Sequence, residues 1–288
     1  MSNSPHWILE GNGLRLELGR RTLVMGILNV TPDSFSDGGA FLSPDQALAH
    51  AERMAAEGAD LIDIGGESSR PGAVPIPVQK ELQRVIPVIE RVAKAIPVPL
   101  SIDTTKAEVA RRAVLSGATM INDISAMRAD PAMPGVAAAA DVPVVLMHMQ
   151  GTPPTMQRRP AYRSLIDDIA EFFQDRLNVL GPMGIRKERV ILDPGLGFGK
   201  TVEHNLEIIR SLDRFSRLGR PVLVGPSRKS FLGKVLDLPV GERLEGTAAA
   251  VTAAVLNGAS MVRVHDVREM VRVVRTADSI KFANPVAG

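Results

Sequence analysis

Three polar residues from distant parts of this chain could together bind a planar heterocycle. Asp103, Asn122 and Asp193 each stand at the end of a short apolar run. Each carboxylate has two oxygens that accept hydrogen bonds, and an amide side chain both donates and accepts, so a ring with several N–H groups would satisfy all three residues. Met147 and Phe198 could contact such a ring, although plain core packing explains Met147 equally well.

Four basic residues near the C-terminal end suggest a site for an anion. Arg228 and Lys229 follow one apolar run, and Arg263 and His265 lie in the next. If these runs are the last two strands of a β/α barrel, the residues stand where such barrels commonly bind phosphate. We therefore expect an anionic ligand here.

Polar residues of this kind end nearly every apolar run of the chain. Taken singly, each could equally anchor a loop or contact a ligand. Buried acids and amides are costly without partners, so many of them together imply either a dense hydrogen-bond network or a polar ligand that completes one. We assign Asp63 and Asp123 mostly to the network. The set comprises Asn29, Asp63, Asp103, Asn122, Asp123, Asp193, Ser227, Lys229, Arg263 and His265.

Eight short apolar runs must position these side chains. They lie at 22–29, 59–66, 98–104, 120–125, 142–149, 190–195, 221–227 and 261–266. Runs without polar alternation indicate strands that are buried on both faces, and the helical patterns between them force parallel pairing. The sequence therefore predicts an α/β fold.

The number of strand and helix units narrows the fold further. Eight units in 288 residues predict a closed (β/α)8 TIM barrel, a fold of about 250 residues whose strand C-ends converge on one mouth. A doubly wound sheet is the alternative. Before the first strand, Asn12 and Gly13 form a turn signal, and Leu14, Leu16 and Leu18 alternate with polar residues. This pattern predicts an N-terminal β-hairpin across the base of the barrel, without a catalytic role.

The composition limits the class of protein. Nothing in it marks a domain boundary, so we expect residues 1–288 to form a single domain. Lys and Arg number 34 against 32 Asp and Glu, and aromatic residues make up 3%, which disfavours a nucleic-acid platform. The chain has no Cys, no apolar stretch long enough for a membrane span and no signal-peptide pattern at its N-terminus. We expect a cytoplasmic protein that handles metabolites.

Local signals place the first two helices. Ser43 with Gln46 predicts a capping box, and Gly58 ends the first helix. The second helical pattern covers 78–96 and has one apolar face. We expect its charged residues to face water; they are Lys80, Glu81, Arg84, Glu90 and Arg91.

Two long loops, at 31–42 and 67–77, lack helical periodicity. Phe35, Asp37 and Arg70 are unusual in mere connections, so we expect mobile lids over the mouth. The segment GLGFGKT at 195–201 is similar to a P-loop, but that pattern needs a glycine where Pro194 stands. We reject a P-loop and expect these glycines to allow a tight turn and the close approach of a ligand.

Eight motifs at the run ends, in this order and spacing, resemble those of bacterial dihydropteroate synthase. The resemblance covers the chain from the first predicted strand to the eighth. It implies a transferase of folate biosynthesis that joins p-aminobenzoate to 6-hydroxymethyl-7,8-dihydropterin diphosphate and releases pyrophosphate. The motifs are GILNVTPDSFSDGG, GGESSRPG, SIDTTK, INDISA, LMHM, LDPGLGFGK, GPSRKSF and RVHD.

The family pattern, carried over residue by residue, implies three groups of contacts. The pterin would lie against Asp103, Asn122, Met147, Asp193, Phe198, Gly225 and Lys229, with Arg263 stacked on its face. The pyrophosphate would bind Asn29, Arg263 and His265, and Asn29 would also ligate a Mg²⁺. The aminobenzoate pocket would be formed or closed by Phe35, Asp37, Ser69, Arg70, Pro71 and Ser227. Ser69 replaces the Thr that is usual in the family, which keeps the hydroxyl and leaves its packing open.

These residues imply a reaction in which the leaving group departs first. We expect Mg²⁺, Asn29, Arg263 and His265 to stabilise the departing pyrophosphate. Asp37 would stabilise the pterin methylene cation and orient the amine. A pterin-binding methyltransferase and a non-catalytic pterin binder are the alternatives. The SRPG and SRKSF segments argue against the first, and the presence of Asp37 and Arg70 argues against the second.

The segment 246–259 is apolar around a whole helical circumference. Such a helix needs cover on its outer side as well as against the barrel. Neighbouring helices could supply that cover. We expect a homodimer because the family resemblance implies one, and it also implies an enzyme that sulfonamide mimics of aminobenzoate target.

Overall fold

Eight parallel strands form a nearly closed barrel in the computed structural model of the protein, which describes residues 6–31 and 43–282. Their hydrogen-bonded order is β8-β7-β6-β5-β4-β3-β10-β9, and a bridge between Leu192 and Val222 links the two edges. The predicted barrel is confirmed, and the doubly wound alternative is wrong. The strands are β3 (Leu23–Asn29), β4 (Leu61–Gly65), β5 (Leu100–Asp103), β6 (Met120–Asp123), β7 (Val144–Met147), β8 (Val190–Asp193), β9 (Leu223–Val224) and β10 (Met261–Val264).

Each strand is shorter than the apolar run that predicted it. The difference is largest at β9, where only two residues form a strand although the run covers 221–227. Pro221 and Pro226 flank this strand, and proline has no N–H group to donate to a sheet. Gly225 and the residues after it therefore belong to a loop at the barrel mouth.

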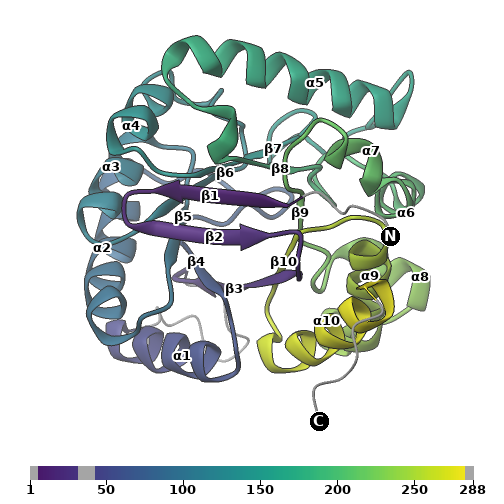
Figure 1. The fold of residues 1–288 in the computed structure, drawn as a ribbon, viewed down its shortest axis with the longest axis horizontal. Coiled ribbons are helices and arrows are strands. Elements are labelled where there is room, and N and C mark those ends of the chain that lie inside the picture. Colours follow the sequence, from purple (N-terminus) through teal and green to yellow (C-terminus); the bar gives the residue numbers. More distant parts are fainter. Residues whose placement is uncertain (1–5, 32–42, 283–288) are drawn as a thin grey trace.

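Helices connect the strands and surround the barrel (Figure 1). The first helix is capped as predicted: the Ser43 hydroxyl accepts from the backbone N–H of Gln46 at 3.2 Å, and the Gln46 side chain accepts from the backbone of Ser43 at 2.9 Å. Gly58 follows its end with a φ of 98°, which favours glycine. The α-helices are α1 (Pro44–Ala56), α2 (Val78–Ala95), α3 (Ala107–Leu115), α4 (Met133–Ala140), α5 (Leu165–Leu180), α6 (Val202–Arg210), α7 (Leu212–Ser216), α8 (Ser230–Leu236), α9 (Leu244–Leu256) and α10 (Val267–Phe282), and 3-10 turns cover Gly181–Met183, Lys187–Arg189 and Val240–Glu242.

The charged face of α2 departs from the sequence prediction at Glu81. Lys80, Glu90 and Arg91 are exposed as expected, but the Glu81 side chain is completely buried. Arg84 is half-buried, and its Nη1 donates to the backbone oxygen of Gly66 at 2.7 Å. Helical periodicity could not reveal that residues from the barrel mouth cover the first turns of this helix.

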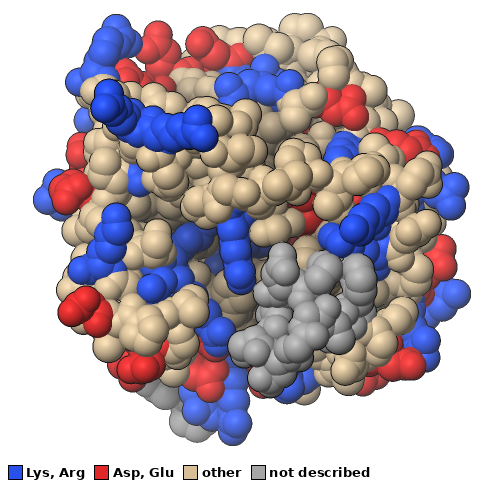
Figure 2. Space-filling model, turned by 180° about the vertical axis from the view of Figure 1, so that it is seen from behind, with Lys and Arg blue, Asp and Glu red and all other residues tan. Residues whose placement is uncertain are grey.

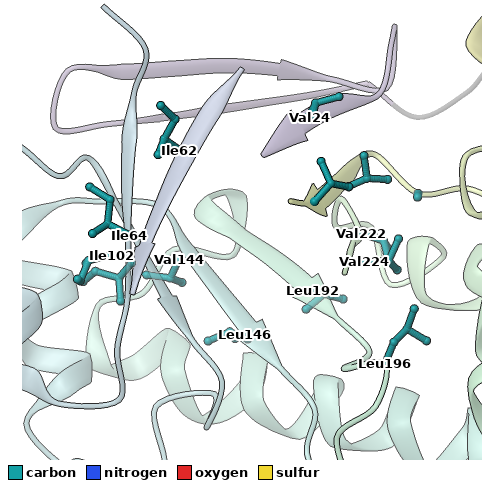
Figure 3. Packing of buried hydrophobic residues seen from close by; sticks show 14 of the residues in the cluster. Val24, Ile62, Ile64, Ile102, Val144, Leu146, Leu192, Leu196, Val222 and Val224 are labelled. Atoms are coloured by element: carbon teal, nitrogen blue, oxygen red, sulfur yellow. The ribbon is translucent and has the colours of Figure 1, made fainter. Parts of the chain in front are cut away.

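The main hydrophobic core lies between the barrel and the helices. Side chains that point outward from the strands pack there against the apolar faces of the helices. Figure 3 shows Ile62, Ile102, Leu146 and Val224 in this layer, each from a different strand. Because every strand takes part, the layer holds all eight strand ends in fixed relative positions.

A second core fills the N-terminal end of the barrel. The strands β1 (Trp7–Gly11) and β2 (Leu14–Leu18) form the predicted hairpin, with Asn12 and Gly13 at its turn. The hairpin lies across the barrel (Figure 1), and its Leu9 and Leu18 side chains are completely buried. They pack with inward-pointing barrel residues such as Met25, Leu61 and Ile191. This end is therefore closed by apolar contacts, which leaves the opposite end for a site.

Neighbouring helices cover only part of α9. It packs against α6, α8 and α10, and Gly246, Ala250 and Ala254 are among its buried residues. Leu244 and Leu256 are exposed at its two ends. No helix in the described ranges is both long and apolar enough to cross a membrane.

Candidate active site

The polar residues predicted to bind a heterocycle meet at the C-terminal end of the barrel. Asp103 ends β5 and is in register with Asn122 of β6, while Met147 ends β7 in register with Asp193 of β8. These four strands are neighbours in the sheet, so Asp103, Asn122, Met147 and Asp193 form one continuous wall. Figure 2 shows the face opposite the hairpin, with Lys and Arg side chains around its centre.

A network of two acids, an amide and an arginine crosses the mouth. Arg263 on β10 donates from Nε to Asp63 Oδ2 at 2.6 Å and from Nη2 to Asp103 Oδ2 at 2.8 Å. Asp63 Oδ2 also accepts from Asn122 Nδ2 at 2.9 Å, and Asp63 is completely buried. Asp63 thus belongs to the network, as predicted, and it orients both Asn122 and Arg263.

Burial affects the pKa values of Asp103 and Arg263 in this network. It raises the pKa of the Asp103 carboxyl well above its usual value, and the nearby Arg263 offsets this only in part. Burial also opposes the charge on Arg263, but Asp63 and Asp103 outweigh it and raise the pKa of the guanidinium. Arg263 therefore stays cationic, while Asp103 is poised to change its protonation when a ligand alters its surroundings.

The end of β8 supplies a third acid, Asp193, and the loop after this strand supplies an aromatic ring, Phe198. Asp193 Oδ1 accepts from the backbone N–H of Gly195 at 2.7 Å, and burial raises the pKa of its carboxyl. Lys229 Nζ lies 4.2 Å from the centre of the Phe198 ring, a cation–π arrangement. Burial lowers the pKa of Lys229, while Asp193 acts against that shift. The acid and the two flanking groups can thus contact one flat ligand together.

Met147 and Phe198 do not join either barrel core. They form a separate apolar cluster with Met149 and Met156, with Ile124 against it. This cluster lies beside the polar wall of the mouth, because Met147 pairs in register with Asp193. The placement suits the apolar edge of a ring-binding pocket better than it suits plain core packing.

His265 and Ser227 form a second small network at the mouth. Ser227 Oγ lies 3.0 Å from His265 Nδ1 and accepts from the His265 backbone N–H at 3.2 Å. Burial lowers the pKa of His265 to about 3, with help from Arg263 and Arg228. The ring is thus neutral at physiological pH. The serine hydroxyl can donate to Nδ1, which leaves Nε2–H as a donor for an anion.

Three further residues of the predicted anion and pterin sites remain, and they are Arg228, Gly225 and Asn29. Arg228 forms a two-point ion pair with Asp266 and is turned toward that partner. Gly225 lies beside Arg263, since a Cβ on it would be 3.8 Å from the Arg263 Cβ. Asn29 ends β3 at the mouth. A Cβ on Gly65 would lie 3.6 Å from Asn29 Oδ1, so glycine keeps space beside that oxygen.

The predicted lids are only partly described. Phe35 and Asp37 lie outside the described residues. Ser69 is half-buried in the β4–α2 loop, while Arg70 and Pro71 are exposed. The backbone N–H of Gly72 donates to Pro153 O in the β7–α5 loop at 3.1 Å, so two loops meet above the wall.

Sequence reasoning missed a buried lysine behind the pocket. Lys200 is 3% exposed, and its Nζ contacts Phe198 O at 3.0 Å, His148 O at 3.3 Å and His148 Nδ1 at 3.0 Å. Burial lowers the pKa of Lys200 to about 7 and that of His148 to about 2. Lys200 therefore ties the loop after β7 to the loop after β8. Its position next to the glycines of GLGFGK was the available signal.

Asp123 serves its own loop and does not reach the pocket. One oxygen accepts from the backbone and hydroxyl of Ser125 at 2.7 and 2.6 Å, and the other accepts from the backbone of Met127 at 3.1 Å. Ala126 and Met127 have φ values of 53° and 60°, which non-glycine residues adopt only at a cost. Asp123 therefore holds a strained turn, in agreement with its predicted network role.

Known proteins are similar to this chain over most of its length. The family of pterin binding enzymes matches residues 25–265 of this chain. The chain is 49% identical over 263 residues to dihydropteroate synthase of Synechocystis sp., covering 91% of each protein. It is 46% identical over 256 residues to dihydropteroate synthase of Escherichia coli, covering 89% of this chain and 90% of the relative.

The similar solved structures are of proteins with the same name as these relatives. A crystal structure of Yersinia pestis dihydropteroate synthase with a sulfonamide drug complex has a TM-score of 0.91 and 46% identity, and the match covers 96% of this chain and 99% of that one. A Xanthomonas albilineans dihydropteroate synthase with 4-aminobenzoic acid has a TM-score of 0.89 and 44% identity, over 98% of this chain and 100% of that one. The similarity thus includes the barrel and nearly the whole sequence.

Proposed function

Because this chain belongs to the dihydropteroate synthases, transferases of folate biosynthesis that form dihydropteroate, we propose that its barrel mouth joins p-aminobenzoate to 6-hydroxymethyl-7,8-dihydropterin diphosphate. The observation that carries the assignment of substrates to residues is the wall of Asp103, Asn122 and Asp193 at neighbouring strand ends. Three hydrogen-bonding side chains beside an apolar edge match a flat ring with N–H groups on its rim.

The pterin would occupy the wall between Arg263 and Phe198. Asp193 and Asp103 would accept from N–H groups of the ring, and Asn122 would supply an amide contact whose orientation Asp63 fixes. Met147 and Phe198 would provide the apolar contacts, with Gly225 leaving room beside Arg263. Lys229 would approach the ring from the side of Phe198. A ring N–H would offset the desolvation cost that raises the pKa values of the two acids.

The diphosphate would bind next to the pterin at Asn29, Arg263 and His265. Arg263 uses Nε and Nη2 on the acids, and a guanidinium has five N–H donors, so it can contact an anion without releasing them. The neutral His265 ring would donate from Nε2. These donors point to a leaving group with several oxygens, which a methyltransferase on the same barrel would not require.

Asn29 would also help to hold Mg²⁺. The described residues contain no group of three His, Asp or Glu side chains that could hold a metal ion. Mg²⁺ nevertheless often binds through one or two protein oxygens together with substrate phosphates and water. The space that Gly65 leaves beside Asn29 Oδ1 fits such an arrangement. When bound, Mg²⁺ would neutralise charge that develops on the leaving diphosphate.

The aminobenzoate would lie under the β4–α2 loop. Arg70 offers a guanidinium for its carboxylate, and Ser69, Pro71, Ser227 and Phe35 would complete the pocket. The Xanthomonas albilineans relative was solved with 4-aminobenzoic acid and the Yersinia pestis relative with a sulfonamide drug. We extend both to this chain as a proposal, so that sulfonamides would compete with aminobenzoate here.

The reaction needs little proton transfer at its start. The bond between the pterin methylene carbon and the diphosphate oxygen breaks first, and Asn29, Arg263 and His265 stabilise the departing anion. The neutral amine nitrogen of aminobenzoate then bonds to the methylene carbon and releases a proton. Asp37 would stabilise the cationic carbon and orient the amine. Holding both substrates in line could supply up to about 7–11 kcal/mol of the barrier reduction.

A homodimer would cover the exposed apolar side chains around α8 and α9. Val235, Leu236 and Val240 are 55%, 40% and 60% exposed, and Leu244 and Leu256 are exposed at the ends of α9. Exposed apolar side chains on these elements suit an interaction surface, and a second copy of the chain is the partner that we propose. We also propose a cytoplasmic location for the enzyme.

The proposal can be tested by mass-spectrometric detection of dihydropteroate together with pyrophosphate release. Purified protein with both substrates and Mg²⁺ should form both products, and omission of Mg²⁺ or the change Asp193→Ala should abolish them. Pterin binding without either product would contradict the synthase assignment and favour the methyltransferase or the non-catalytic binder.

A further inference from the structure

A cluster of two acids and a lysine lies behind the β4–α2 loop, with Glu81 buried and the other two residues partly buried. Lys106 Nζ is 2.6 Å from Glu81 Oε2 on α2 and 2.9 Å from Glu67 Oε1 at the start of the loop. The Glu81 side chain is 0% exposed, Lys106 is 17% exposed and Glu67 is 21% exposed. Buried charges are expensive unless they are paired, so this cluster calls for a functional reason.

Glu67 closes the loop on itself. Its Oε1 accepts from the backbone N–H of Ile76 at 2.6 Å, across nine residues. The same oxygen contacts Lys106, so one carboxylate oxygen joins the beginning of the loop, its end and a side chain from the β5–α3 segment. The loop that carries Ser69 and Arg70 is thereby fixed at its base, while its tip reaches the β7–α5 loop.

Helix α2 supports this arrangement from below. Arg84 Nη1 donates to Gly66 O at 2.7 Å. A Cβ on Gly66 would lie 2.6 Å from Val85 Cγ1 and 3.1 Å from Glu81 Cγ, so the loop base can press against the helix only because residue 66 is glycine. The close approach brings Glu81 beneath Lys106, and the lysine covers the carboxylate that helical periodicity would leave in water.

The charges of the cluster are balanced so that the lysine stays protonated. Burial acts against the charge of Lys106, but its hydrogen bonds to Glu81 and Glu67 outweigh burial and raise its pKa. One Glu81 oxygen, Oε1, has no hydrogen-bond partner in the described part of the chain. Glu81 therefore depends on Lys106, and loss of the lysine alone would leave a buried charge without compensation.

We propose that Lys106 is a positioning residue, which ties Glu67 to Glu81 and so holds the β4–α2 loop in the place where it receives aminobenzoate. This inference rests on the proposed function, since it assigns Ser69 and Arg70 of that loop to the aminobenzoate. Lys106 also follows Asp103 by three residues. One short segment therefore carries a residue of the pterin wall and the anchor of the aminobenzoate loop.

The double variant Lys106→Met with Glu81→Gln tests the proposal, because it removes the tie without leaving a charge on the completely buried Glu81 side chain. We expect the KM for aminobenzoate to rise about tenfold, since small displacements of a binding loop have effects of at least this size. The dissociation constant for the pterin diphosphate, measured by calorimetry, should be unchanged. Lys80 is an exposed lysine on α2, the helix that carries Glu81. The variant Lys80→Met is the matched control and should leave both constants at their wild-type values.

Glu67→Gln provides a second test if the double variant fails to fold. Glutamine keeps an oxygen for the Ile76 N–H and loses only the ion pair, so the KM for aminobenzoate should rise by a smaller factor, about threefold. An unchanged KM in a folded variant, or equal losses for both substrates, would overturn the positioning role. A wild-type protein that forms no dihydropteroate would instead contradict the proposed function, so the two failures are distinguishable.

Discussion

The two ends of the barrel are built from the same eight strands but from opposite kinds of side chain. At the N-terminal end, Leu9 and Leu18 of the hairpin close the barrel with apolar contacts alone. At the C-terminal end, Asp63, Asp103 and Arg263 are buried together in an ion-pair network. Apolar closure stabilises the fold, whereas buried charges are costly and are retained where they bind or react. Stability and function are thus separated along the barrel axis.

The largest expected effect comes from breaking the ion-pair network. Arg263→Met should lower the free energy of unfolding by about 3–5 kcal/mol, because it leaves the buried Asp63 without its cation, and it should also abolish dihydropteroate formation. Urea denaturation and a product assay measure the two effects. Arg228→Met is the control: that arginine is 42% exposed in its pair with Asp266, so the loss should be below about 1 kcal/mol.

At the opposite end, a change should reduce stability and leave catalysis intact. Leu18→Ala removes a completely buried side chain of the hairpin and should cost about 2–5 kcal/mol of unfolding free energy. The KM values for both substrates, measured at a temperature where the variant is folded, should stay at wild-type levels. Ile8→Ala, at a 41% exposed position of the same hairpin, should change neither quantity. A raised KM in Leu18→Ala would show that the two ends are coupled.

A change in the proposed reaction chemistry should affect rate more than binding. Asp37→Asn keeps the size of the side chain and removes the charge that we assign to stabilising the cationic carbon. We expect kcat to fall about 100-fold, while the dissociation constant of the pterin diphosphate changes little. Single-turnover kinetics together with calorimetry separate the two. Equal losses in both would contradict the assigned role.

A further expected effect is a pH dependence of stability that Lys200 introduces. The groups that act on its ammonium are His148, Asp193 and Lys229. Burial lowers the pKa of Lys200 from 10.5 to about 7, so between these values the unfolded chain holds a proton that the folded chain lacks. Unfolding then takes up a proton, and stability due to this residue rises with pH.

A comparison with Lys200→Met isolates the contribution of Lys200 to the pH dependence of stability. The free energy of unfolding of the wild-type protein should increase relative to that of the variant as the pH rises from about 7 to about 10. Urea denaturation at several pH values provides the measurement. A difference that is flat or that falls with pH would mean that Lys200 is fully protonated in the folded protein.

The sequence predicts those parts of the structure that depend on neighbouring residues. The hairpin turn at Asn12 and Gly13 and the cap at Ser43 follow from local chemistry, and apolar runs mark the strands. The pairing of Arg263 with Asp63 joins residues 200 positions apart, and only closure of the barrel brings them together. For the same reason Glu81 was wrongly expected to face water, since the lysine that covers it comes from another strand-helix connection.

The most direct test of the separation between the two ends is a calorimetric titration with the pterin diphosphate. Wild-type protein and Leu18→Ala should bind it with the same affinity, whereas Asp193→Ala should bind it at least about 100-fold more weakly, because a buried polar group of the ligand loses its partner. Wild-type affinity in folded Asp193→Ala would contradict the account, since it would place the pterin away from the wall at the C-terminal end of the barrel.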